Sequence, residues 1–189
     1  MCVRNFCIFE LSSSPKFDVS QIMKILKLNL LSLLLLFFVT SCQKDEGFIE
    51  DEANYSIDLN LANETDWQMA DEILVLVNLH RASVNLPAIL KDQQYASAYA
   101  VEHTLYMIEK SEINHDNFNI RTEALKEKGA IKVGENVAFG YTSAESVVSA
   151  WLNSPSHKRA IEGNYTHSGF GVMKGSNGGY YFTQLFYRN

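Results

Sequence analysis

The chain has 189 residues, of which 47% are apolar, and a formal net charge of −6. This length and composition predict one globular domain with a sizeable core. Because nucleic-acid binding needs a basic face, the acidic balance excludes that class of partner.

The first 41 residues predict a secretory signal. Lys24 and Lys27 precede an apolar run over residues 30–39, which is too short to span a bilayer of about 30 Å but suits the central region of a signal peptide. We interpret residues 23–41 as the signal, and residues 1–22, which fit no part of one, as an extension upstream of the true start.

The signal ends in Val39-Thr40-Ser41-Cys42, which resembles a bacterial lipobox and predicts a lipidated Cys42 as the first mature residue. An ordinary signal peptide with a chance cysteine is the alternative. Cys2 and Cys7 lie upstream, so a domain starting at Cys42 has no disulfide and no cysteine metal site. Gln43-Lys44-Asp45-Glu46 is similar to the surface-export signal of lipoproteins in two-membrane bacteria. We therefore expect a lipid-anchored protein of the bacterial cell envelope, in the outer membrane and facing the surface.

Residues 42–64 are acidic and lack periodicity, which is typical of a tether. The globular domain is expected over residues 65–189. A helix starting after Thr65-Asp66 and ending before Pro87 is the first predicted element, and a second helix follows Asp92.

Helices and strands then alternate. The spacing predicts a third helix over 120–128, a strand over 131–139, a helix after Ser143 and a short helix after Ser154-Pro155. Strands over 170–173 and 180–187 are joined by a turn at 176–179 that is typical of a hairpin. This order predicts an α+β fold with a small antiparallel sheet covered by helices.

Three residues are the strongest candidates for chemistry. His115 lies in a polar loop, where the simpler interpretation is a surface histidine. Glu135 interrupts an apolar strand, so it either faces solvent, accepts hydrogen bonds or serves a site. His157 lies in the first turn of a short helix, where the helix dipole favours a neutral imidazole that can bind a metal.

Other chemistries fit less well. The chain has no His-Glu-x-x-His motif and no cysteine pair, so a metal site would be assembled from distant segments. Ser154 and Ser156 flank His157, but no nucleophile elbow is present and capping explains Ser154. His103 lies on the apolar stripe of the second helix and is expected at the edge of the core.

The chain resembles bacterial CAP (SCP-like) domains, relatives of cysteine-rich secretory proteins, antigen 5 and plant pathogenesis-related proteins. The motifs that carry this resemblance occur in the family's order: Asn78-x-x-Arg81, His103-x-x-x-Met107, His115, Gly134-Glu135-Asn136-Val137-Ala138, Trp151-x-x-Ser154-Pro155-x-His157-Lys158, Gly169-Phe170-Gly171 and Tyr181-x-Thr183-Gln184-x-Phe186.

The resemblance implies an α-β-α sandwich with an antiparallel sheet between helical layers. It also implies an open cleft, which two histidines and two glutamates line in eukaryotic members. His115, Glu135 and His157 match three of these positions. Asn153 and Ser154 stand where the second glutamate would be, which weakens a two-carboxylate mechanism and removes one metal ligand.

Three functions follow as expectations. The first is a binding module whose cleft holds a divalent metal, Zn²⁺, through His115, His157 and Glu135, together with a small-molecule, lipid or peptide ligand. The second is a metal-dependent hydrolase with Glu135 as the general base. The third is a structural envelope protein with an inherited cleft.

Overall fold

A computed structural model describes residues 55–189, which belong to a compact unit beginning at Ala53. The expectations for the upstream extension, the signal, Cys42 and the first part of the tether lie outside the described residues. Within residues 55–189, no helix has both the length and the apolar character needed to cross a membrane.

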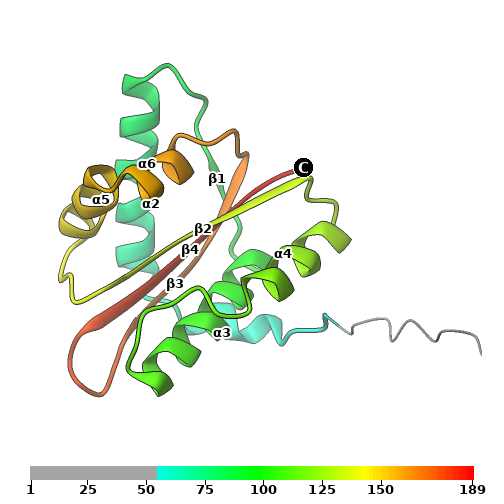
Figure 1. The fold of residues 1–189 in the computed structure, drawn as a ribbon, viewed down its shortest axis with the longest axis vertical. Coiled ribbons are helices and arrows are strands. Elements are labelled where there is room, and N and C mark those ends of the chain that lie inside the picture. The colour runs from blue at the N-terminus through cyan, green and yellow to red at the C-terminus, as the bar shows by residue number, and fades with distance from the viewer. Residues whose placement is uncertain (1–54) are drawn as a thin grey trace, which may run out of the picture. The chain divides into compact units, whose positions relative to one another are not determined.

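The described region contains helices and strands in mixed order (Figure 1). Its helices are η1 (Leu59–Glu64, a 3₁₀ helix), α2 (Trp67–Ser83), α3 (Tyr95–Lys110), α4 (Phe118–Glu127), α5 (Ala144–Asn153) and α6 (Pro155–Ile161). Its strands are β1 (Leu90–Lys91), β2 (Lys132–Phe139), β3 (His167–Lys174) and β4 (Tyr180–Arg188).

The strands form one sheet in the order β1-β3-β4-β2. β4 pairs antiparallel with both β2 and β3, whereas the two-residue β1 runs parallel to β3. In the β2–β4 ladder Glu135 stands opposite Leu185. The position of β2 at the edge of the sheet matters for the site, because one side of this strand has no neighbouring strand.

Helices cover both faces of the sheet. Figure 1 shows α3 and α4 on one side and α2, α5 and α6 on the other, which confirms the expected α-β-α sandwich. α3 approaches the sheet very closely, because a Cβ added at Gly169 or Gly171 would lie 2.3 Å from backbone atoms of Ala96 or Ala100. The two glycines therefore let the helix rest directly on the backbone of β3.

The opposite face is filled by aromatic and branched side chains. Trp151 of α5 is 1% exposed and meets Phe182 of β4 edge to face, with ring centroids 6.5 Å apart. Phe170, Phe186 and Ile73 are fully buried in the same cluster. Trp151 and aromatic residues of β3 and β4 thus form the core on this face.

The helix caps differ in detail from the sequence prediction. Asp66 caps α2 by accepting from Met69 N, and Ser143 forms a reciprocal capping box with Ser146. Asp92 acts from two residues before the cap position of α3, accepting from the backbone N–H of Gln94 and Ala96. These bonds satisfy amide groups that the first turn of a helix leaves without intrahelical partners.

The packed region extends upstream of residue 65. η1 lies against α3 and buries Ala62, and the Tyr99 hydroxyl donates to the carbonyl of Tyr55. These residues fall in the segment whose composition indicates a tether. A 3₁₀ helix of six residues is too short to show a hydrophobic period, which explains why the sequence pattern does not reveal it.

Candidate functional site

Glu135 is a buried carboxylate in the middle of β2. Its side chain is only 1% exposed and lies on the face covered by α3 and α4. Arg121 of α4 binds it through two hydrogen bonds, Nε to Oε2 at 2.7 Å and Nη2 to Oε1 at 2.9 Å. This bidentate ion pair compensates for the loss of water around the carboxylate.

Arg121 is a residue of the site that the sequence analysis does not select. Its side chain is 4% exposed, and its Nη1 also donates to the carbonyl of Asp116. Burial lowers the pKa of the guanidinium, while Glu135 opposes that shift. A signal is present in the sequence, because Arg121 falls on the same side of α4 as the buried Ala124 and Leu125. An arginine on a buried helical stripe requires a partner.

His115 is the third member of a hydrogen-bonded chain that runs from Arg121 through Glu135. It lies in the loop between α3 and α4, and its side chain is 51% exposed. Its Nδ1 lies 2.7 Å from Glu135 Oε1, a distance at which the ring nitrogen donates to the carboxylate. In the neutral ring Nε2 is then left as an acceptor, as in the carboxylate–histidine pairs that support metal ligands.

His157 approaches the same edge of the sheet from the other layer. It lies on α6, and its backbone carbonyl accepts a 3.2 Å hydrogen bond from Asn136 Nδ2. Burial lowers the pKa of His157, and the nearby His115 lowers it further.

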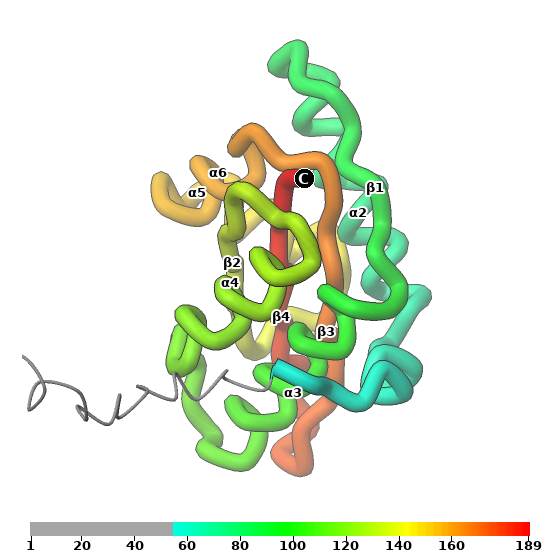
Figure 2. The backbone as a smooth tube through the Cα atoms, turned by 90° about the vertical axis from the view of Figure 1, so that its right-hand side faces the viewer, coloured from blue at the N-terminus to red at the C-terminus, as the bar shows by residue number. Residues whose placement is uncertain are grey.

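The order Glu135-Asn136 brings the two layers together. Successive side chains of a strand point to opposite faces, so Glu135 reaches α4 and Asn136 reaches α6. Both helices contact β2, and Figure 2 shows where α4, α6 and this strand lie along the backbone. At the neighbouring Gly134 a Cβ would lie 2.4 Å from the Tyr165 hydroxyl, so a larger residue there would displace that side chain.

The three predicted residues do not form a closed metal site. Throughout the described region, residues 55–189, no group of three His, Cys, Asp or Glu side chains could hold one metal ion. Both oxygens of Glu135 are engaged, Oε2 by Arg121 and Oε1 by Arg121 and His115. Asn153 and Ser154, which stand at the position of the second glutamate, have no carboxylate. Asn153 is exposed, and Ser154 Oγ contacts Ser156 Oγ.

His103 adds a third imidazole beside Glu135. It is buried, and its Nε2 lies 2.9 Å from the carbonyl of Asn114 and 4.0 Å from Glu135 Oε1. Burial lowers its pKa, followed by the effect of Arg121. The neutral ring therefore donates from Nε2 to the carbonyl, in agreement with its expected place at the edge of the core.

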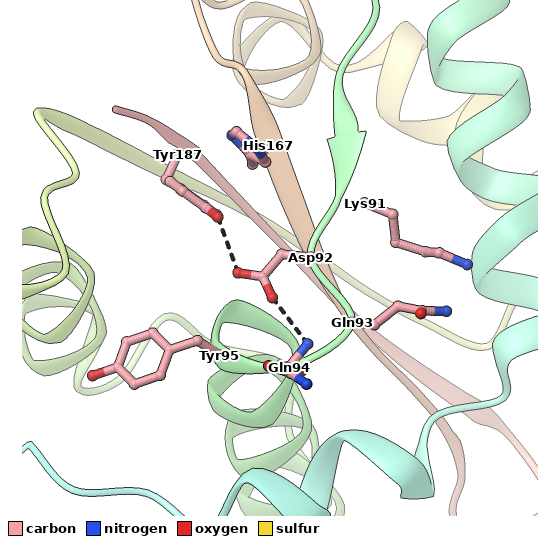
Figure 3. A pocket seen from close by; sticks show the side chains of 7 residues that line it. All are labelled: Lys91, Asp92, Gln93, Gln94, Tyr95, His167 and Tyr187. Atoms are coloured by element: carbon pink, nitrogen blue, oxygen red, sulfur yellow. Dashed lines mark hydrogen bonds between the residues drawn. The ribbon is translucent and has the colours of Figure 1, made fainter.

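A hollow of about 530 Å³ lies away from these residues, near the start of α3 (Figure 3). Asp92 stands at its centre, but Tyr187 and two backbone amides already occupy the carboxylate. His167 lines this hollow and stacks on Tyr187, with centroids 5.0 Å apart. None of the three predicted cleft residues lies there.

Comparisons with known proteins agree with the fold. The model of CAP, the cysteine-rich secretory protein family, matches residues 74–186. The Uncharacterized membrane protein YlbC of Bacillus subtilis (strain 168) is 33% identical over 122 residues, which cover 61% of this chain and 33% of that protein. The chain thus spans about a third of the length of the curated relative that it matches.

Two solved structures share the fold. An outer surface protein from Borrelia burgdorferi is 25% identical with a TM-score of 0.58, and the match covers 65% of this chain and 93% of that one. An extracellular protein containing a SCP domain from Bacillus anthracis str. Ames is 26% identical with a TM-score of 0.54, covering 66% and 44%. The family is thus of an extracellular type, and the chain belongs to the CAP, or cysteine-rich secretory protein, family.

Proposed function

We propose that this chain is an extracytoplasmic binding module, held at the bacterial envelope by lipid on Cys42. The order of basic residues, apolar run, small residues and cysteine supports the anchor. The outer-surface and extracellular proteins with the same fold support the location. In this proposal the acidic tether lets the domain stand away from the membrane.

The contact between His115 and Glu135 carries the binding proposal. The buried Arg121–Glu135 pair holds the carboxylate still, and the carboxylate fixes the His115 ring with Nε2 available to a ligand. His157 supplies a second imidazole, whose pKa is lowered by burial and by His115. Because a neutral imidazole keeps a lone pair for a ligand, the cleft is suited to a transition-metal ion.

Two imidazoles fit an open metal site rather than a closed structural one. Zn²⁺ takes four ligands in most protein sites, so a ligand of the module or water would complete the shell. Glu135 then orients the metal ligand His115 by accepting a hydrogen bond from its Nδ1. Removal of Glu135 is expected to weaken metal binding by about 10–100-fold. The engaged state of its oxygens argues against the alternative role as a hydrolytic base.

Zinc titration by calorimetry tests the proposal on residues 43–189, which include the whole compact unit. We expect about one equivalent to bind, with binding lost in the His115→Ala/His157→Ala variant. His167→Ala is the matched control, because that histidine lines the hollow beside Asp92, away from the proposed site. No binding by the wild-type chain, or equal binding by the double variant, would leave the cleft as inherited architecture in a structural envelope protein.

A further inference from the structure

The open edge of β2 has an unusual main-chain position at Glu135. In an antiparallel ladder, alternate residues pair with the neighbouring strand and the residues between them point away from it. Gly140 N donates to Tyr180 O, which places the even-numbered residues of β2 toward β4. The N–H and C=O of Val133, Glu135 and Val137 consequently point to the open side.

Side chains from the α5–α6 side cover the carbonyls on either side of Glu135. Trp151 Nε1 donates to Val137 O at 3.1 Å, and the Tyr165 hydroxyl reaches Val133 O at 3.5 Å. These contacts occupy two carbonyls of an edge that could otherwise pair with another chain. Within residues 55–189, no such side chain reaches the main chain of Glu135.

Exposure supports the same picture. Glu135 as a whole residue is partly exposed, although its side chain is 1% exposed, so its accessible surface belongs to the main chain. The exposed part of Glu135 therefore includes its main chain, on the open side of β2. A donor and an acceptor on one extended residue match one residue of a second extended chain, which would exchange both hydrogen bonds with it.

We infer that the ligand of this cleft is an extended peptide segment, which pairs with the main chain of Glu135 and lies between the two imidazoles. The inference rests on the proposed binding function and gives its ligand class. Recognition by strand addition takes affinity from main-chain hydrogen bonds and selectivity from side-chain pockets. The side chains bound to Val133 O and Val137 O leave Glu135 as the residue of this edge that pairs with the peptide main chain. The imidazoles must therefore supply the selectivity.

Amide hydrogen exchange on metal-free residues 43–189 tests the inference. In the free chain, the Glu135 amide is expected to exchange faster than those of Gly134 and Asn136, which pair with β4. The probe is acetyl-Thr-Val-Thr-Val-Thr-Val-amide, whose β-branched residues favour an extended backbone. At ten times its dissociation constant, it should slow exchange at Glu135 about tenfold.

The matched control is the same peptide with ester links in place of its amides, which removes the N–H donors without adding bulk. It should bind several-fold more weakly and give correspondingly less protection. The inference is overturned by a Glu135 amide already as protected as its neighbours. It is also overturned by unchanged exchange at peptide concentrations up to about 10 mM, or by equal protection from the ester analogue. The exchange experiment uses metal-free protein, so its outcome does not depend on whether the chain binds zinc.

Discussion

The buried ion pair between Arg121 and Glu135 gives the sharpest prediction. The side chains are 4% and 1% exposed, so solvent screening does little to reduce the consequence of breaking the pair. Arg121→Met leaves a buried carboxylate without its bidentate partner, hydrogen-bonded to His115 and 4.0 Å from His103, and Glu135→Leu leaves a buried guanidinium. Each change should lower the free energy of unfolding by about 3–5 kcal/mol.

The double variant Arg121→Met/Glu135→Leu should be much more stable than the sum of the single changes predicts. A buried ion pair replaced by apolar side chains of similar volume is often neutral in stability. Urea unfolding of residues 43–189, followed by tryptophan fluorescence, measures all three free energies and their coupling. Total stabilities of about 5–15 kcal/mol keep the single variants measurable in a typical domain.

Lys126→Met is the control on the same helix. Lys126 pairs with Glu123 at 2.8 Å, but both side chains are about half exposed, so this change should cost at most about 1 kcal/mol. The reasoning is refuted if Arg121→Met costs no more than the control. It is equally refuted if the double variant loses as much stability as the two single changes added together.

Two further predictions concern the edge of β2 and the second imidazole. Trp151→Phe removes the donor to the buried Val137 carbonyl and should lower the free energy of unfolding by about 1–3 kcal/mol in urea titrations; an unchanged midpoint would show that the bond contributes nothing. His115→Ala should raise the His157 pKa toward its ordinary value without reaching it, because burial, the larger cause, remains; NMR titration of the ring protons measures this. Since the folded-state pKa of His157 is lowered, its stability contribution is present above the unfolded value of about 6.5 and is lost as the pH falls through the folded value. His157→Gln should therefore flatten the loss of stability toward acid, and a pH profile identical to the wild type would contradict the assignment.

Local signals are sufficient to predict most of the fold. Three such signals are the apolar spacing at Ile73 and Val77, the Ser143 cap and the turn before β4. Each involves residues close together in the sequence, so the element that it predicts does not depend on distant packing. The two-residue β1 and the six-residue η1 escape prediction because neither is long enough to show a period. Their existence depends on β3 and α3, which lie far along the chain.

The site is predicted only in part. His115 and Glu135 are selected separately from the sequence, and the structure joins them by a 2.7 Å contact. Arg121 cannot be matched to Glu135 from the sequence, because a loop and a change of element separate them and no spacing rule connects helix and strand positions. The sequence selects Glu135 as a candidate ligand or base, and the structure adds that Arg121 and His115 engage both of its oxygens.

The alternation at residues 135 and 136 makes the two side chains impossible to exchange. A variant with asparagine at 135 and glutamate at 136 has the same composition, length and net charge as the natural chain. It would nevertheless turn a carboxylate toward the His157 carbonyl, where Asn136 now donates, and present a neutral amide to the Arg121 guanidinium. The order of these two residues therefore helps to attach α4 and α6, one from each helical layer, to the same strand.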